Sequence, residues 1–235
     1  MHIAVLNANT DRSRFASQHP RDGEKFRRLV HEVRPDWQVS DYDVTSGIYP
    51  QTWQGIDGVI ITGSPASAAS DDEWVLKLLV VIRELRAEKT PMFGVCFGHQ
   101  AIARALGGRV VRNEGPFILG IVDAEVLTAP CWMTNAPPTF RIAAAHGEQV
   151  DQIPQGAVVN CRGPACPVGG FHIDRHVFTN EYHPEMTHHF IESLTEAMAR
   201  KSDPEVIDIA RGSFGKPADR AKFAEWIAVF FEQAT

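Results

Sequence analysis

The first half of the chain alternates between strand-like stretches and stretches with the pattern of amphipathic helices. Apolar-rich runs bounded by turn residues predict strands at 2–7, 38–44, 57–62 and 91–95. Apolar residues at helical spacing predict helices that include 26–33, 74–85 and 97–108. This order predicts an α/β fold whose mainly parallel central sheet carries helices on both faces. In such sheets, ligands bind at the carboxyl ends of the strands.

The pattern changes after residue 108. Short strand-like runs between 109 and 180, separated by Gly, Pro and Asn, predict antiparallel strands and excursions at one end of the sheet. The last part of the chain is predicted to be helical. Asp203 and Pro204 have the form of an N-cap followed by proline in the first helical turn. The stripe from Phe223 to Phe231 is predicted to be core.

Charge and composition narrow the range of functions. The chain has 23 Lys and Arg against 29 Asp and Glu, a net charge of −6, and no dense basic cluster. This argues against nucleic acid or an anionic membrane as a main partner. No run of about twenty apolar residues and no signal-like leader is visible. Four cysteines in 235 residues do not resemble a disulfide framework, so we expect a reduced, cytoplasmic protein.

Cys96 lies in the sequence GVCFGHQ, between the fourth predicted strand and a predicted helix. The form Gly-x-Cys-x-Gly at a strand-to-helix corner is the thiol version of a nucleophile elbow. The positive end of the helix favours a thiolate, and the backbone N–H of Phe97 could stabilise an oxyanion. The alternative is a buried structural cysteine.

His183 and Glu185 lie two residues apart in YHPEM, just after the last strand-like run. In an extended segment both side chains face the same way, so Glu185 could fix the tautomer of His183 and leave its other nitrogen free to act on a thiol. The alternative is a surface His-Pro-Glu turn.

Four segments together resemble the class I, or triad-type, glutamine amidotransferase family. They are GVCFGHQ, EYHPEM, ITGSP (61–65) and AHGEQV (145–150), and they occur in the order typical of the family. The resemblance implies a flavodoxin-like amidotransferase domain over residues 1–190, with a small antiparallel β excursion. Residues 191–235 would be a C-terminal helical extension packed on the same domain.

The resemblance also implies a role for each matching residue. Cys96 would be the nucleophile, His183 the general base and acid, and Glu185 the residue that orients His183. Backbone N–H groups of Gly63 and Phe97 would form the oxyanion hole. The residues that would contact substrate are Ser64, Gln100, Gly147 and Glu148.

The implied reaction is cleavage of the γ-amide of glutamine through a thioester, giving glutamate and ammonia. It requires no metal and no organic cofactor. The protein could act alone on a small-molecule substrate or supply ammonia to a synthetase on another chain. Because the sequence has no P-loop motif, ATP-dependent acceptor chemistry would have to come from elsewhere.

Two departures from the family pattern leave the substrate open. Many members have Gln where this chain has Glu181, and Asn where it has Ala145. A γ-glutamyl peptidase, which cleaves a larger leaving group, is therefore an alternative, as is a catalytically silent regulatory or interaction protein. An α/β-hydrolase with a cysteine nucleophile is disfavoured by the closeness of His183 to Glu185. Metal binding by His172 and His176 is disfavoured because FHIDRH is predicted to be strand-turn-strand.

Overall fold

The computed structural model describes residues 1–234; Thr235, the last residue of the predicted C-terminal extension, lies outside the described residues. The first half of the chain forms the predicted alternation of strands and helices. Its elements are β1 (His2–Asn7), α1 (Arg14–Ser17), α2 (Asp22–His31), β2 (Gln38–Asp43), the 3₁₀ helix η1 (Val44–Ser46), β3 (Gly58–Ile61), α3 (Glu73–Ala87), β4 (Met92–Val95) and α4 (Phe97–Ala105). The short helix α1 was not among the sequence predictions.

The second half contains short strands followed by three helices, also as predicted. Its elements are β5 (Arg109–Arg112), β6 (Ile118–Val126), β7 (Thr139–His146), β8 (Glu148–Gln152), β9 (Val158–Gly163), β10 (Cys166–Ile173), β11 (Val177–Asn180), α5 (His188–Met198), α6 (Pro204–Ser213) and α7 (Arg220–Ala234). The Asp203 side chain caps α6 by accepting the N–H of Glu205, and Pro204 occupies the first turn, which confirms the predicted helix start.

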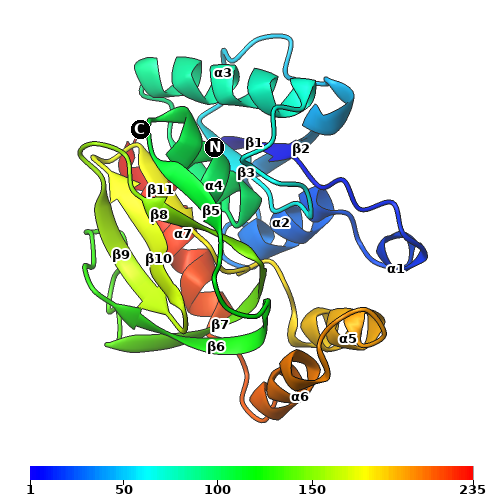
Figure 1. Cartoon of the computed structure of the whole chain (residues 1–235). Helices are drawn as coiled ribbons and strands as arrows, with labels where there is room; N and C mark the ends of the chain where they lie inside the picture. Colours follow the sequence, from blue (N-terminus) through cyan, green and yellow to red (C-terminus); the bar gives the residue numbers. More distant parts are fainter. Residues whose placement is uncertain (235) are drawn as a thin grey trace.

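Within residues 1–234, nine strands form one sheet in the order β2-β1-β3-β4-β11-β10-β9-β6-β7, and β5 pairs with β8 separately (Figure 1). The strands from β2 to β11 run parallel, and those from β11 to β7 run antiparallel. The fold is thus the predicted α/β class.

Two details of the sheet differ from expectation. The antiparallel strands continue the main sheet, and only β5 and β8 form a separate excursion. The last strand-like run, which was expected to be antiparallel, forms β11, which pairs antiparallel with β10 but parallel with β4. Periodicity shows that a strand forms but not which strand it will neighbour. The parallel pairing brings the segments that follow β4 and β11 to the same carboxyl edge.

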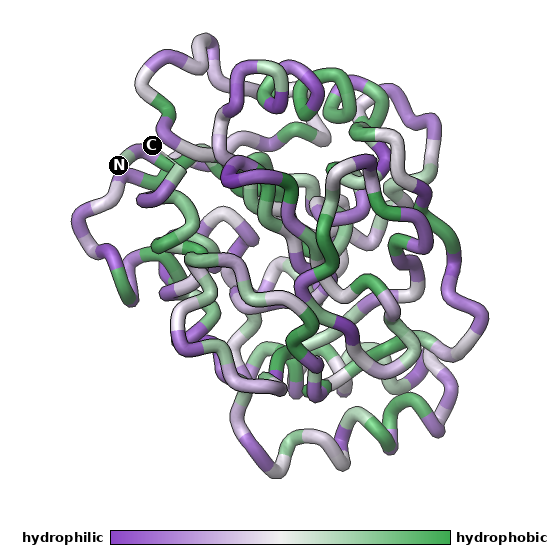
Figure 2. The backbone as a smooth tube through the Cα atoms, turned by 90° about the vertical axis from the view of Figure 1, so that its left-hand side faces the viewer, coloured by the Kyte–Doolittle hydropathy of each residue, from purple (hydrophilic) through white to green (hydrophobic). Residues whose placement is uncertain are grey.

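The parallel strands send alternate side chains to two hydrophobic clusters, one on each face of the sheet. In β1, Ile3 and Val5 belong to the cluster that includes residues of α2 and α7. Ala4 and Leu6 belong to the cluster that includes residues of α3 and α4. In Figure 2 the hydrophobic segments gather in the interior and the hydrophilic turns lie outside. No helix within residues 1–234 is long and apolar enough to cross a membrane.

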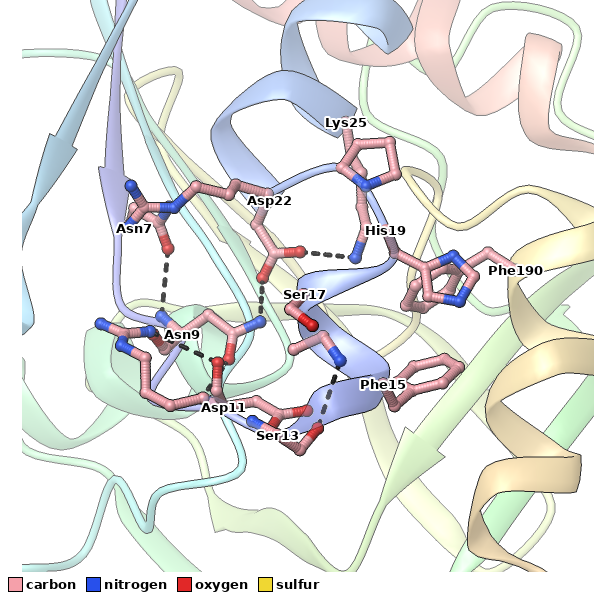
Figure 3. A pocket seen from close by; sticks show the side chains of 14 residues that line it. Asn7, Asn9, Asp11, Ser13, Phe15, Ser17, His19, Asp22, Lys25 and Phe190 are labelled. Carbon is pink, nitrogen blue, oxygen red and sulfur yellow. Dashed lines mark hydrogen bonds and ion pairs between the residues drawn. The ribbon is translucent and has the colours of Figure 1, made fainter.

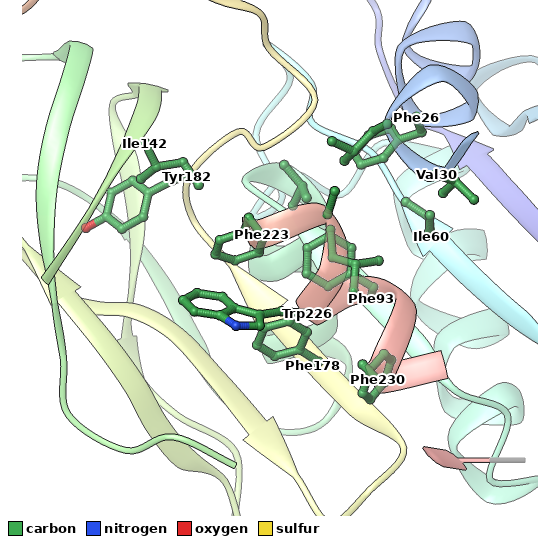
Figure 4. Close-up of a cluster of buried hydrophobic side chains, with 14 of the residues drawn as sticks. Phe26, Val30, Ile60, Phe93, Ile142, Phe178, Tyr182, Phe223, Trp226 and Phe230 are labelled. Carbon is green, nitrogen blue, oxygen red and sulfur yellow. The ribbon is translucent and has the colours of Figure 1, made fainter. Parts of the chain in front are cut away.

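Helix α7 fills the face of the sheet where its parallel and antiparallel parts meet (Figure 4). Phe223, Trp226 and Phe230 are at most 1% exposed, which confirms the predicted core stripe. The rings of Phe178 in β11 and Phe223 are stacked, with centroids 6.0 Å apart and an interplanar angle of 10°. One hydrophobic cluster thus contains residues from both sides of the proposed boundary at residue 190.

The strand β7 is an edge of the sheet, and backbone groups on its unpaired side are hydrogen-bonded at two positions, Arg141 and Ala143. Asp219, which precedes α7, accepts the N–H of Arg141 through its carboxylate (2.8 Å) and donates its own N–H to the Arg141 carbonyl (2.7 Å). Two residues along, the carbonyl of Ala143 accepts the N–H of His183 (2.8 Å). The peptide of His183 is therefore anchored to the edge of the sheet.

Candidate active site

Cys96 occupies a strained corner between β4 and α4. Its backbone φ is +47° and its ψ is −108°. Residues other than glycine rarely adopt a positive φ of this kind. Hydrogen bonds on both sides hold this corner. The N–H of Cys96 donates to the Asn180 carbonyl at the end of β11 (2.9 Å), and its carbonyl accepts the N–H of Gln100 in α4 (2.9 Å). The thiol is thus fixed at the carboxyl edge of the parallel strands.

The glycines on either side of Cys96 allow the helix to begin this close to the sheet. A Cβ on Gly94 would lie 2.7 Å from backbone atoms of Gly98. A Cβ on Gly98 would lie 2.2 Å from the carbonyl oxygen of Ile61 in β3. Both positions therefore require glycine for close backbone packing, as the Gly-x-Cys-x-Gly pattern predicts.

His183 and Glu185 form a buried hydrogen-bonded pair. The Nδ1 of His183 lies 2.6 Å from a carboxylate oxygen of Glu185, and their side chains are 5% and 2% exposed. This contradicts the alternative of a surface turn. The predicted contact is present, although the backbone at 183–186 is a turn, closed by the Met186 N–H on the His183 carbonyl (3.3 Å), and not an extended strand. Among the residues that the structure describes, the Nε2 of His183 has no hydrogen-bond partner.

Gly63 lies between the cysteine and the histidine. A Cβ on it would lie 2.9 Å from the Cε1 of His183 and 3.7 Å from the Cβ of Cys96. The Gly63 carbonyl accepts the hydroxyl of Thr62 (3.1 Å), which also accepts the N–H of Ala8 (2.9 Å). The buried Thr62 hydroxyl thereby fixes the orientation of the loop, a contact that sequence reasoning missed.

A cavity of about 520 Å³ opens at this point and is lined by Cys96, His183 and Glu185. Most of the other predicted site residues line it as well, namely Gly63, Ser64, Gln100, Gly147 and Glu148. Phe97 is the exception among the predicted residues. Its backbone N–H contacts the Cys96 thiol, while its side chain stacks on Trp74 in the core (5.3 Å).

Gln100 is engaged with the protein. Its side-chain amide donates to the Glu148 carbonyl (3.0 Å) and to a carboxyl oxygen of Glu181 (2.9 Å). The Glu148 carboxylate in turn accepts the Ser67 hydroxyl (2.9 Å). In this structure Gln100 therefore ties the loop at 146–148 to the floor of the cavity.

Burial raises the pKa of the Cys96 thiol well above its ordinary value, and the nearby carboxyl groups of Glu181 and Glu185 act in the same direction. The Phe97 N–H opposes them. The helix start thus contributes in the direction expected from the sequence but is outweighed by burial. The thiol is neutral in the resting protein, and it can act as a nucleophile only if a base accepts its proton as it reacts.

The far end of the cavity contains charged residues that sequence reasoning did not single out. Asp22 of α2 pairs with Lys25 (2.7 Å) and accepts the side-chain amide of Asn9 (2.7 Å). The Lys25 ammonium also lies over the Phe190 ring of α5, 3.7 Å from its centroid. These residues also line an adjoining pocket of about 280 Å³ (Figure 3). The spacing of Asp22 and Lys25 on one helix was a visible signal for the pair, but not for its place beside the cavity.

Comparison of the sequence with known protein families identifies the family to which this chain belongs. The sequence pattern of the family described as glutamine amidotransferase class-I matches residues 26–194. The chain belongs to the class I glutamine amidotransferase family. Members of this family are typically hydrolytic enzymes that act on glutamine or γ-glutamyl amides.

Individual relatives of this amidotransferase-family chain differ in their names. It is 33% identical to γ-glutamyl peptidase 3 of Arabidopsis thaliana over 55% of its length and 54% of the relative's, so the match spans about half of that protein. It is 29% identical to the glutamine amidotransferase-like protein chyE of Penicillium rubens over 92% of both chains. It is 28% identical to one subunit of the glutamine-hydrolysing GMP synthase of Halobacterium salinarum over 70% of its length and 85% of the relative's.

Solved structures show the same fold. A glutamine amidotransferase of Thermotoga maritima superposes with a TM-score of 0.77 at 17% identity, covering 98% of both chains. A glutamine amidotransferase of Methylobacillus flagellatus superposes with a TM-score of 0.73 at 22% identity, covering 99% of this chain and 94% of the other.

Proposed function

We propose that this protein hydrolyses the γ-amide of glutamine with Cys96 as nucleophile, His183 as general base and acid, and Glu185 as the residue that orients His183. The observation that carries the proposal is the meeting of the strained Cys96 corner and the buried His183–Glu185 pair at one cavity, with Gly63 between them. Family membership supports the same reaction class.

The proposed reaction passes through a thioester on Cys96. The Cys96 thiol gives its proton to the Nε2 of His183 while its sulfur forms a bond to the γ-carbonyl carbon of the substrate. The carbonyl oxygen becomes an oxyanion, which the N–H groups of Phe97 and Gly63 stabilise in this proposal. The C–N bond then breaks, and the leaving nitrogen takes the proton from His183 to leave as ammonia. Water, deprotonated by His183, attacks the thioester and releases glutamate and the Cys96 thiol.

A second candidate is hydrolysis of larger γ-glutamyl amides. Besides the proposed triad, the cavity is lined by the ion pair of Asp22 and Lys25. Its lining also includes the apolar side chains of Phe117, Met186, Leu194 and Met198. A cavity of about 520 Å³ is in the range of pockets that enclose ligands well above the size of glutamine. The similarity to a γ-glutamyl peptidase points the same way.

The proposal leaves two fates for ammonia. It is either the final product or the nitrogen source for a synthetase on a separate chain, and the similarity to one subunit of a GMP synthase supports the second setting.

Hydrolysis assays with the purified protein distinguish glutamine hydrolysis from hydrolysis of larger γ-glutamyl amides. Ammonia release from L-glutamine is measured beside product release from γ-glutamyl dipeptides and glutathione. We expect turnover that is lost in Cys96→Ala and retained in Cys131→Ala, because Cys131 is an exposed free thiol outside the site. Turnover of the dipeptides alone supports the second candidate. No turnover of any substrate, with or without a synthetase chain, contradicts both and supports a catalytically silent protein.

A further inference from the structure

Glu181 is a carboxyl group buried beside the proposed nucleophile. It directly follows β11, is 0% exposed, and donates its N–H to the Gly169 carbonyl (2.8 Å). One side-chain oxygen accepts the amide of Gln100 (2.9 Å), and the carboxyl group lies close to the Cys96 thiol. The other oxygen faces the Nε2 of His99 at 3.6 Å, and in the described part of the chain neither atom has a hydrogen-bond partner.

The contacts of His99 indicate whether its Nε2 or the facing oxygen of Glu181 carries a proton. The hydroxyl of Thr179 donates to the Phe171 carbonyl (3.0 Å), so its lone pair accepts the Nδ1–H of His99 (2.8 Å). In the neutral ring, Nε2 is then an acceptor. Burial lowers the pKa of His99 to about 3, with His146 acting in the same direction and the Val168 carbonyl opposing, so the ring is neutral. The two atoms lie 3.6 Å apart and are not hydrogen-bonded, but a lone pair on Nε2 would be repelled by an ionised carboxylate oxygen, so this arrangement favours a protonated Glu181.

No cation compensates a charge on Glu181. Within residues 1–234, neither a lysine nor an arginine pairs with it, and its two histidine neighbours lie 3.6 and 3.9 Å away. Burial lowers the pKa of the second, His146, to about 4, so it is neutral as well. The titratable groups around the carboxyl are those of Cys96, His99, His146, Glu148, Cys166 and Tyr182. Each of these groups is neutral or negative at neutral pH.

We propose that Glu181 is a neutral carboxylic acid in the working protein and serves as a positioning residue, holding Gln100 and His99 behind Cys96 while keeping negative charge away from the thiol. Its protonation is argued from its burial, its contacts and the neutral histidines around it, and its importance for turnover rests on the function proposed above. A protonated Glu181 presents one acceptor to Gln100 and one donor to His99, the same pattern that a glutamine side chain would present.

The direction of the pKa of Glu181 agrees with this assignment. Burial raises it well above the ordinary carboxyl value, the charge of Glu148 adds to the increase, and the contacts with Gln100 and Cys96 oppose it. When Glu181 ionises on the alkaline side, its charge disfavours the Cys96 thiolate. The reactivity of Cys96 should therefore rise less steeply with pH than that of an isolated buried thiol.

Alkylation of Cys96 by iodoacetamide tests the proposal without any amide substrate. The rate is followed against pH and located at Cys96 by peptide mass spectrometry, in the natural chain and in Glu181→Gln. We expect the two rates to agree at low pH. At alkaline pH the variant should react about tenfold faster, the factor that one unit of thiol pKa represents. A variant that already reacts faster at neutral pH would overturn the proposal, because Glu181 would then carry a charge there.

Infrared spectroscopy of the natural chain provides a second test that does not depend on how the variant folds. At neutral pH we expect the carbonyl band of a protonated carboxylic acid, which converts to a carboxylate band only on the alkaline side. The band should be absent in Glu181→Gln and present in the control Glu185→Gln. Absence of the band from the natural chain at neutral pH contradicts the assignment. Neither measurement depends on turnover, so failure of the proposed function would be seen separately.

Discussion

At the scale of single residues, the proposed chemistry depends on the pair formed by His183 and Glu185. Glu185 accepts the Nδ1–H of His183 over 2.6 Å and thereby leaves Nε2 as the acceptor for a thiol proton. Because burial keeps the Cys96 thiol protonated, attack requires that proton transfer. A change that permits the other tautomer removes the base without removing the ring.

We therefore expect Glu185→Gln to lower kcat for γ-glutamyl amide hydrolysis by about 10²- to 10⁴-fold with a much smaller change in KM. Steady-state kinetics check this result, and an unchanged thermal melt shows that the fold is retained. A kcat within a factor of about three of the natural chain's would mean that Glu185 does not orient the base.

Short motifs predicted the contact between His183 and Glu185 and the strained corner at Cys96, because neighbouring residues determine both. The hold of Thr62 on the Gly63 loop and the facing of Glu181 and His99 could not be predicted in this way. Thr62 meets its distant partner Ala8 only once β1 and β3 are paired. Glu181 meets His99 only once β11 lies beside β4, the strand that α4 follows. The departure at Glu181 was visible in the sequence, but its partners were not.

At the scale of elements, glycines in two helices have opposite structural roles. Gly98 in α4 packs its backbone against β3, so that an added Cβ would lie 2.2 Å from the Ile61 carbonyl oxygen. Within residues 1–234, a Cβ added to Gly212 in α6 would have no atom within 4 Å apart from its own helix backbone and chain neighbours. Only the first is required by packing.

Gly98→Ala should lower the free energy of unfolding by about 3 kcal/mol or more, because backbone atoms must separate to admit the methyl group. Gly212→Ala should raise it by about 0.5 kcal/mol through the higher helix propensity of alanine. Urea unfolding of both variants measures the contrast. Equal destabilisation by the two changes would show that the close approach of α4 to β3 is not a constraint.

Sequence periodicity predicted most of these elements, because burial pattern and turn residues are local properties. It did not predict the direction of β11, which depends on its insertion between β4 and β10. The strand itself is a short buried run that fits a parallel or an antiparallel neighbour equally well. That insertion brings His183 to the edge occupied by Cys96, so the site depends on the parallel pairing of β11 with β4, which the sequence did not predict.

At the scale of the whole molecule, α7 joins the parallel and antiparallel parts of the sheet. Trp226 is 1% exposed, contacts Phe140 of β7 with ring centroids 5.7 Å apart, and donates its indole N–H to the Thr134 carbonyl (3.0 Å). The C-terminal helix is therefore part of the main core.

Trp226→Ala should lower the free energy of unfolding by about 3–5 kcal/mol, since it leaves a cavity and an unpaired carbonyl. Ile209→Ala, at a position that is 60% exposed, should change it by less than about 0.5 kcal/mol. Chemical denaturation monitored by circular dichroism compares the two. A small effect at Trp226 would favour a C-terminal extension that is independent of the amidotransferase domain.

The dependence of stability on pH should reveal the buried acid. Because the pKa of Glu181 is raised in the folded state, the folded chain binds one more proton than the unfolded chain once pH exceeds the ordinary carboxyl value. Stability contributed by this group is complete below that value and declines as pH rises toward the folded pKa. As pH rises above the ordinary carboxyl pKa toward the raised pKa of the folded state, the natural chain should lose unfolding free energy relative to Glu181→Gln. A difference that is constant with pH would contradict this expectation.

The hydrogen bonds that cover the edge of β7 link loss of activity to aggregation in this protein. A bare edge strand is a template on which a second molecule can add a strand, and here the peptide of His183 occupies part of that template. A lesion that detaches the segment around His183 removes the proposed base and opens the strand to its neighbours in the same event. Inactive molecules of this kind should be lost by precipitation, so the fraction that remains in solution should consist of chains whose histidine is still in place.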